Sequence, residues 1–236
     1  MRKIAAAASA IRELGFLNGG CYLVDALLSA ASKGRVRLRK YYFVAQPVRR
    51  QPWLPGKRGS QLEVRRVFPS DPLIEAFPRP AQAMPYRFRQ EAVCLAALKD
   101  GAFIGFLWFT LGPYQEDEVR CRYVPRPSGK SAWDFDVYLA PEHRSGIAFL
   151  KLWDEANRFL TERYVAWSLS RISAFNRQSL LSHTRMNAAR IGTALFLSVG
   201  GLQLCASTVR PFVHLSVRNE SFPTFELAPQ KKKTPQ

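Results

Sequence analysis

Cysteine and histidine are scarce in this chain. Its 236 residues include four cysteines and three histidines, and the cysteines lie far apart, without a C-x-x-C pair. This distribution argues against a disulfide framework and against a zinc site, and it favours reduced thiols in a cytoplasmic protein. We therefore expect no metal. The residues concerned are Cys21, Cys94, Cys121 and Cys205, and His143, His183 and His214.

Acidic residues are also few. The chain has 18 Asp and Glu against 35 Lys and Arg, which gives a formal net charge of +17. An excess of this size favours an anionic partner, and four classes fit: a phosphorylated cofactor, an acidic protein, nucleic acid or an anionic membrane surface.

Long hydrophobic runs are missing as well. The uncharged run at residues 191–208 is shorter than a bilayer needs and contains Gly200 and Gly201, so it predicts two strands joined by a tight turn. At the N-terminus, Arg12 and Glu13 interrupt the apolar residues before a signal-peptide core can build up. These features predict a cytoplasmic protein, with a peripheral position on a membrane left open.

Apolar residues are plentiful, at 47% of the chain, which is enough for a sizeable core. Three regions are expected: a basic N-terminal extension of two short helices and a strand (1–60), a globular domain (61–227) and a disordered basic tail (228–236). Residues 33–66 carry eleven Lys and Arg against Glu63 alone. Within this segment Arg35, Arg37 and Arg39 alternate with apolar residues, which is the period of a strand.

The order of predicted elements gives the fold class. It is α/β (α+β), a mixed and mostly antiparallel sheet flanked by helices. We expect strands at 62–67, 92–98, 103–111, 119–123, 132–139, 165–172, 191–198, 202–207 and 212–217, and helical segments at 71–89, 146–162 and 176–186.

Residues 137–150 predict an anion site. An apolar strand ends at a Pro-Glu corner, a short Arg-Ser-Gly loop follows, and a helix with apolar residues at helical spacing begins at once. The free N–H groups of a first helical turn and the helix dipole favour a negative group such as a pyrophosphate. The residues assigned to this site are Val137, Tyr138, Leu139, His143, Arg144, Ser145, Gly146, Ile147 and Ala148.

This strand–loop–helix and a second motif together resemble the GNAT superfamily of acyl-CoA-dependent N-acyltransferases. The loop at 143–148 keeps the family's Gly-x-Ala end, with His143 in first position and one residue fewer. The second motif is Asn-x-x-Ser-x-x-x-His at 176–183, where the family often has tyrosine in place of His183. A predicted strand separates the two motifs.

The resemblance implies a fold, a co-substrate and roles for residues. It implies that acyl-CoA and an amine bind together and that the acyl group passes directly between them. A backbone N–H of residues 137–139 would polarise the thioester carbonyl, the loop would bind the pyrophosphate, and Asn176 would contact the cofactor arm. His183 stands at the position of the proton donor to the leaving thiolate, although a histidine packed in the core is the simpler interpretation. For Asn176 the simpler interpretation is the N-cap of a helix.

Acyl transfer also needs a group that takes the amine's proton. Asp134 and Asp136 alternate on one predicted strand and should share a face, and the acids at 116–118 precede them. Asp136 is the first candidate for the base and Glu118 the second. The alternative is that these acids neutralise arginines such as Arg120 and Arg122.

The basic segment at 33–66 leaves the partner open. It could support the phosphates of CoA, dock an acidic acyl carrier protein as donor, lie on an anionic membrane or contact RNA, or it could be a solvated basic face. The predicted function is transfer of an acyl group from acyl-CoA or acyl carrier protein to an amine. The alternative is a GNAT scaffold without turnover that holds nucleic acid or an acidic protein.

Overall fold

A computed structural model describes residues 9–144, 146–218 and 221–230. The chain forms two compact units. Unit 1 comprises residues 1–46, 115–124 and 170–236, and unit 2 comprises residues 47–114 and 125–169. Part of the predicted basic tail, residues 231–236, lies outside the described residues.

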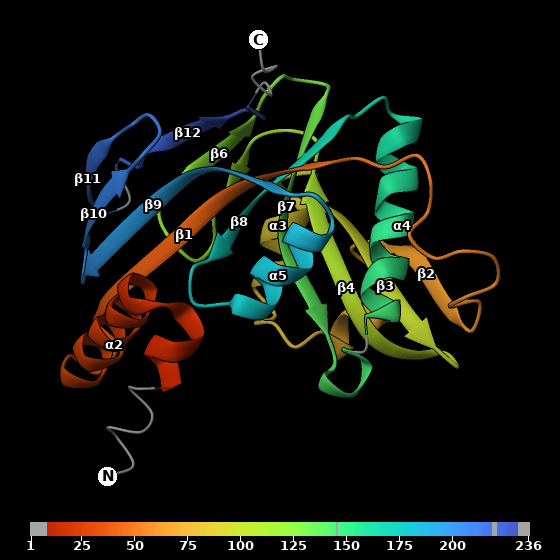
Figure 1. The fold of residues 1–236 in the computed structure, drawn as a ribbon, viewed down its shortest axis with the longest axis horizontal. Coiled ribbons are helices and arrows are strands. Elements are labelled where there is room, and N and C mark those ends of the chain that lie inside the picture. The colour runs from red at the N-terminus through yellow and green to blue at the C-terminus, as the bar shows by residue number, and fades with distance from the viewer. Residues whose placement is uncertain (1–8, 145, 219–220, 231–236) are drawn as a thin grey trace. The chain divides into compact units, whose positions relative to one another are not determined.

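Unit 2 contains an antiparallel sheet covered by one long helix. Its strands are β2 (Leu62–Val67), β3 (Val93–Lys99), β4 (Ala102–Thr110) and β7 (Ser131–Leu139), paired in the order β2-β3-β4-β7. Helix α4 (Ile147–Glu162) packs across these strands (Figure 1). Its buried residues, among them Leu152, Trp153 and Ala156, recur at helical spacing, as an amphipathic helix on a sheet requires.

A bulge interrupts the pairing of β7 with β4. Trp108 pairs with Asp136 and Phe109 pairs with Asp134, so Phe135 is an extra residue on β7. Such a bulge breaks the simple alternation of side chains along a strand.

The expected helical stretch at 71–89 consists of two short pieces. They are a 3-10 helix, η1 (Pro72–Ala76), and helix α3 (Ala83–Phe88). Asp71 accepts a hydrogen bond from the Leu73 amide at the start of η1. Pro78 and Pro80 lie between the two pieces and prevent a continuous helix because proline lacks the amide hydrogen.

The segment before β2 follows α4 along its length. Near the C-terminal end of α4, the Arg49 amide donates to Asn157 Oδ1 over 3.3 Å. Farther along, the amides of Trp53 and Leu54 donate to the two carboxylate oxygens of Asp154, over 2.6 and 3.1 Å. A Cβ on Gly59 would lie 3.3 Å from Ile147 Cγ2, in the first turn of α4. The segment therefore brings its basic turn at 55–60 to the N-terminal end of α4.

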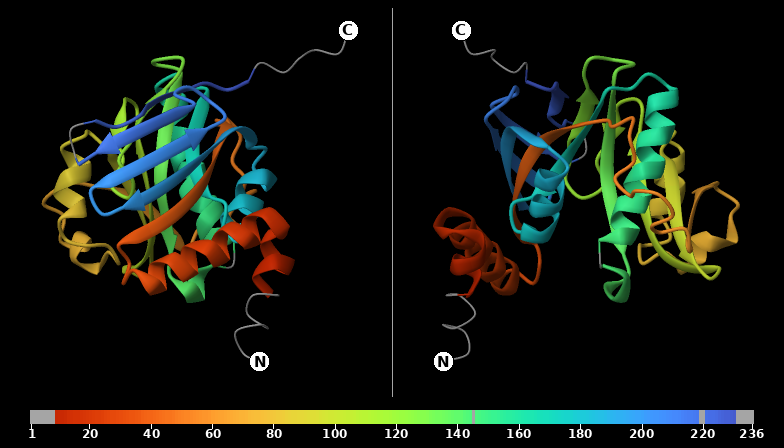
Figure 2. Two further views of the ribbon diagram at one scale, coloured as in Figure 1. Left: turned by 90° about the vertical axis from the view of Figure 1, so that its left-hand side faces the viewer. Right: turned by 45° about the vertical axis from the view of Figure 1, so that its right-hand side comes forward.

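Unit 1 contains an antiparallel sheet of β1 (Val36–Pro47), β9 (Ala189–Val199), β10 (Leu202–Ser207) and β11 (Val213–Val217), in the order β11-β10-β9-β1 (Figure 2). The predicted turn at Gly200 and Gly201 joins β9 to β10, and Gly200 has a φ of 54°. One face of this sheet supplies Tyr41, Phe43 and Phe196 to a core that also holds aromatic rings of β6 (Arg122–Pro125) and β12 (Thr224–Leu227).

Three described helical segments accompany the sheet of unit 1. Residues 9–14 are helical, and α2 (Phe16–Ala31) follows Gly15, whose φ is 78°. Asp25 of α2 accepts hydrogen bonds from the Leu38 amide and from the guanidinium of Arg37, which fixes α2 beside β1. Helix α5 (Arg177–Arg185) begins after β8 (Trp167–Ser173).

The chain passes between the units within four strands, at 46–47 in β1, at 124–125 in β6, and in two further short strands. The first three residues of β8 belong to unit 2 and the rest to unit 1, and β5 (Tyr114–Gln115) is divided between its two residues. In unit 2 the pairs β2–β3, β3–β4 and β4–β7 are antiparallel, and in unit 1 so are the pairs β1–β9, β9–β10 and β10–β11. The fold class predicted from the sequence, an α/β arrangement with a mostly antiparallel sheet flanked by helices, is confirmed.

Among the described helices, none is both long and apolar enough to span a bilayer.

Candidate functional site

The predicted anion site is a strand, a tight loop and a helix N-terminus in unit 2. Strand β7 ends at Leu139, a 3-10 turn (Pro141–His143) follows, and Gly146 directly precedes α4. Arg144 lies in this loop, and its Nε donates to the Leu139 carbonyl over 3.0 Å. Ser145 lies outside the described residues.

Gly146 decides the form of this loop. Its φ is 93°, a conformation that is strained for any residue with a Cβ. Within the part of the chain that the structure describes, no side chain caps the start of α4. The amides of the first helical turn therefore remain as donors, and with the dipole of a 16-residue helix they suit an anion.

Three segments of unit 2 that carry cationic side chains meet at the N-terminal end of α4. Lys57 and Arg58 lie in the turn that ends at Gly59, and Gly59 packs against Ile147. Lys151 is one turn into the helix, and its Cδ would lie 3.9 Å from a Cβ on Gly59. Arg144 comes from the loop itself. The sequence places Lys57 and Arg58 in a basic segment with several possible partners, the phosphates of CoA among them. It does not bring these residues to the start of α4, because that depends on the bonds to Asp154.

Asp136 is engaged by two arginines. Arg79 donates through Nε and Nη2 over 2.8 and 2.7 Å, and Arg87 donates through Nη1 over 2.7 Å. Burial raises the pKa of Asp136, but the hydrogen bonds and charges of Arg79 and Arg87 outweigh it, so the pKa lies below its ordinary value. The carboxylate is thus ionised and a weak base, and its contacts are those of an anchor for two guanidinium groups.

Asp134 has a different partner. It is buried, and Ser168 Oγ, from the first part of β8, donates to its Oδ2 over 2.6 Å. The bulge at Phe135 breaks the alternation from which a shared face was predicted. The structure thus gives Asp134 and Asp136 separate partners.

In unit 1, the acids at 116–118 meet Arg171 of β8. Arg171 donates to both oxygens of Glu116 over 2.8 and 2.9 Å and lies 2.9 Å from Glu118 Oε2. The hydroxyl of Tyr41 donates to the same Glu118 oxygen over 2.8 Å, and Arg39 Nε lies 3.4 Å from its other oxygen. Glu116 is buried, whereas the Glu118 side chain is 45% exposed.

The alternative that these acids neutralise arginines thus holds for Arg171 and Arg39 rather than for the two arginines that the sequence suggested. Arg120 donates through its side chain to the carbonyls of Gly201 and Arg218, and its amide donates to Gln203. The Arg122 amide donates to the Pro223 carbonyl. Sequence reasoning could not choose among these arginines, because Arg171 lies more than 50 residues from the acids it meets.

His183 is a buried residue of α5. Its Nδ1 lies 3.1 Å from Oε1 of Gln46, which is also buried. Burial lowers the pKa of His183 to about 4. A pKa this low does not suit the role of proton donor that the resemblance implies, and the surroundings of His183 are those of a packed core histidine.

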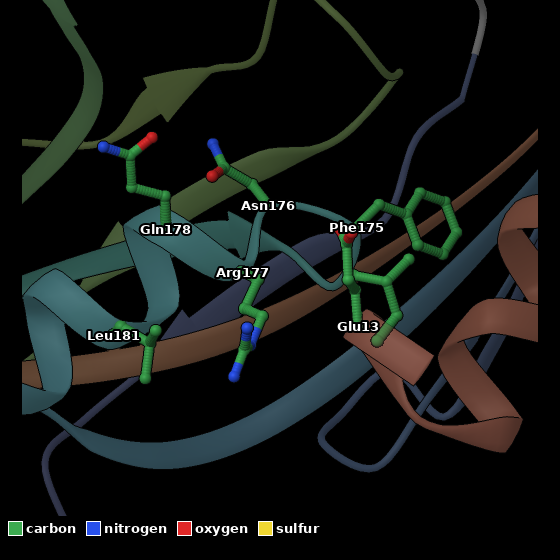
Figure 3. A pocket seen from close by; sticks show the side chains of 7 residues that line it. Glu13, Phe175, Asn176, Arg177, Gln178 and Leu181 are labelled. Carbon is green, nitrogen blue, oxygen red and sulfur yellow. The ribbon is translucent and has the colours of Figure 1, made fainter. Parts of the chain in front are cut away.

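Asn176 caps α5. Its Oδ1 accepts a hydrogen bond from the Ser179 amide over 3.0 Å, as the N-cap alternative predicts. Beside it lies an open hollow of about 470 Å³. Figure 3 shows the side chains that line it, from the start of α5 and from the N-terminal helical segment: Glu13, Leu14, Phe175, Asn176, Arg177, Gln178 and Leu181. The resemblance pointed to Asn176 but not to Arg177 or to the hollow.

Comparisons with known proteins find similarity in structure and not in sequence. No family model matches the chain, and no curated protein matches it. A protein of unknown function from Staphylococcus epidermidis is 10% identical, with a TM-score of 0.46, over 75% of this chain and 68% of that one.

Two further solved structures are GNAT or acetyltransferase proteins by description. A tandem GNAT protein from the clavulanic acid biosynthesis pathway is 13% identical, with a TM-score of 0.47, over 73% of this chain. The match spans only 57% of that longer protein. An aminoglycoside acetyltransferase from an uncultured soil sample is 16% identical, with a TM-score of 0.37, over 54% of this chain and 88% of that one.

Proposed function

We propose that the chain is a GNAT-like N-acyltransferase that uses acyl-CoA, or an acyl carrier protein thioester, to acylate an amine. The observation that carries the proposal is the strand–loop–helix that ends at Gly146, with the basic turn at 55–60 packed on the first turn of its helix. Helix N-termini with free amides bind phosphate groups, and CoA carries a pyrophosphate and a 3′-phosphate.

The residues of unit 2 fit a CoA-type co-substrate. The amides of Gly146, Ile147 and Ala148 would bind the pyrophosphate, helped by His143, Arg144 and Ser145. Lys57 and Arg58 would bind the 3′-phosphate, which gives part of the basic segment a purpose. Backbone amides of residues 137–139 would polarise the thioester carbonyl. The contact of Asn176 with the cofactor arm, which the resemblance implies, stays a prediction.

Transfer requires a neutral amine. Its nitrogen attacks the thioester carbon, the carbon–sulfur bond breaks, and the thiolate leaves and takes up a proton. Glu118 is the candidate that best suits the removal of the amine's proton, because its carboxylate is partly exposed and Tyr41 holds one of its oxygens. Asp136, Asp134 and His183 remain predictions, and the low pKa values of Asp136 and His183 argue against proton transfer by either.

A ligand panel tests this function. Acetyl-CoA and longer acyl-CoAs should raise the melting temperature, since a ligand at a hundredfold excess over its Kd adds about 2.7 kcal/mol of stability. The double variant Lys57→Gln/Arg58→Gln should weaken binding of CoA but not of dephospho-CoA, which lacks the 3′-phosphate. Lys99→Gln, at the β3–β4 turn of the same unit, is the matched control.

The alternative function is a GNAT scaffold without turnover that holds nucleic acid or an acidic protein. The positive charge of the chain favours it, and the same panel separates the two. No stabilisation by any acyl-CoA, together with RNA binding that weakens steeply with salt, would replace the enzyme by the binding module.

A further inference from the structure

One face of the sheet in unit 1 is apolar across three strands. Pairs of residues directly opposite each other share a face of a sheet, and the register places Leu202 opposite Val217, Leu204 opposite Leu215 and Ala206 opposite Val213. Leu195, Leu197 and Val199 of β9 continue this face. We call these nine residues the outer face: Leu195, Leu197, Val199, Leu202, Leu204, Ala206, Val213, Leu215 and Val217.

The outer face is open to solvent at the side of β10 and β11. Val213 is 68% exposed and Leu215 57%, whereas Gln203, Cys205 and Ser216, which alternate with residues of this face, are buried. The strands have thus turned their polar side chains inward and their apolar side chains outward. Exposed contiguous apolar surface of this kind marks a site of association.

Helix α2 borders the outer face and has the same character. Tyr42 lies opposite Thr193, two residues along β9 from Leu195, and its hydroxyl donates to Asn18 of α2 over 2.9 Å. Phe16 is 80% exposed and Leu27 71%. The only charged residue of α2 is Asp25, which is paired with Arg37. Figure 2 looks onto these strands in its left-hand view, with α2 along one end.

Cations lie at both ends of the strands that form the outer face. At the β9–β10 turn, the Arg35 carbonyl accepts from Gly200, and both Arg218 and Arg120 donate to the Gly201 carbonyl. At the opposite end, Arg210 lies in the exposed β10–β11 turn, and the Arg190 guanidinium covers the ring of Tyr42 at 3.8 Å. The outer face itself contains no acid.

We propose that the outer face and α2 dock onto an anionic lipid bilayer. Exposed aliphatic and aromatic side chains would enter the interface while the cations at both ends meet lipid phosphates, which is how amphipathic segments bind membranes peripherally. A second copy of the chain fits less well. A two-fold contact would set one basic end against another basic end, whichever way the copies were turned.

Vesicle flotation of the full chain tests the proposal. The protein should float with vesicles of about three parts phosphatidylcholine to one part phosphatidylglycerol and stay behind with phosphatidylcholine alone. Raising the salt from about 0.1 M to about 1 M shortens the Debye length from about 10 Å to about 3 Å, and it should release most of the bound protein.

Matched variants locate the surface. Val213→Thr/Leu215→Thr places β-branched threonine, which suits a strand, at two exposed positions and should weaken binding about tenfold. Arg35→Gln and Arg210→Gln should each weaken it about fivefold. Phe68→Thr removes an exposed ring from unit 2 and should leave binding to the vesicles unchanged. Melting temperatures close to that of the unaltered chain would establish that the variants fold.

Three outcomes would overturn the proposal. They are failure to float with either vesicle, equal binding to neutral and anionic vesicles, and a dimer in sedimentation equilibrium that Val213→Thr/Leu215→Thr dissociates. The last would assign the outer face to a second copy of the chain.

Discussion

At the scale of single residues, the environment of a side chain decides what it can do. Asp136, Glu118 and His183 were all candidates for moving a proton, and the chemistry of each residue type allowed it. Two guanidinium groups hold Asp136 where only 12% of its side chain is exposed, and burial keeps His183 neutral. Glu118 also lies beside two arginines, but its side chain is 45% exposed and its carboxylate stays accessible. The order of the candidates therefore changes, with Glu118 first.

Glu118→Gln should reduce acyl transfer more than binding. The amide can still accept from Tyr41 but cannot take up the amine's proton, so we expect kcat to fall by about a hundredfold with little change in KM. Steady-state kinetics over a range of pH would measure this. Asp117→Asn, a neighbouring exposed acid, is the control, and normal turnover of Glu118→Gln would exclude Glu118 as the base.

Asp136→Asn should act mainly on stability. Breaking a buried ion pair by removing one partner costs about 3–5 kcal/mol, and here both Arg79 and Arg87 lose a carboxylate. Urea unfolding would measure the loss. A variant of normal stability whose kcat has collapsed would instead restore Asp136 as the catalytic base.

His183 should make the chain sensitive to acid. In the unfolded chain a histidine takes up a proton below about pH 6.5, whereas the folded chain resists until about pH 4. The free energy of unfolding is therefore unaffected by this group above pH 6.5 and should fall by about 3 kcal/mol as the pH drops to 4. Chemical denaturation of wild type and His183→Gln at both pH values measures the free energy of unfolding. If that free energy falls equally in both proteins as the pH drops, His183 is not the cause of the acid sensitivity.

At the scale of elements, the loop before β2 acts as a strap along α4. Its amides donate to two polar residues of α4, Asn157, which is buried, and Asp154, which is half-buried. The strap supplies Lys57 and Arg58 to the start of α4, so the proposed phosphate site depends on contacts that are about two to three helical turns away from it.

Asp154→Ala should therefore weaken CoA binding from a distance. Two backbone amides lose their acceptor, the turn at 55–60 is released, and we expect roughly a tenfold weaker Kd for CoA with little change for dephospho-CoA. Isothermal titration would measure both ligands. Glu155→Ala, which removes a partner of Arg158 on the same helix, is the control. Equal losses for the two ligands would mean that the strap does not serve the 3′-phosphate.

At the scale of the whole molecule, the basic N-terminal segment is part of the fold. Strand β1 pairs with β9 along ten residue pairs and carries the buried rings of Tyr41 and Phe43. A chain cut at residue 60 would lose this strand, and we expect it to be insoluble or unfolded, because an exposed sheet edge and a lost aromatic core are both unfavourable. Circular dichroism of the truncated chain would measure this, with removal of residues 231–236 as the control.

The sequence alone determined much of the local structure. The predicted helix at 146–162 is α4 to within one residue, and the predicted strands at 191–198, 202–207 and 212–217 match β9, β10 and β11 closely. These predictions succeed because periodicity and glycine turns act between near neighbours in the chain. The prediction of one helical stretch at 71–89 was wrong in part, because two prolines divide the stretch into two short pieces.

Only the tertiary structure decided which groups meet. Arg79 and Arg87 reach Asp136 across 57 and 49 residues, Arg171 reaches Glu116 across 55, and the strap reaches Asp154 across about 100. The chain has many more basic residues than acids, and no local sequence pattern distinguishes the arginine that will be buried beside an acid. The strand–loop–helix at the centre of the proposed function is readable in the sequence because it is local, whereas the surroundings that would make it a CoA site are not.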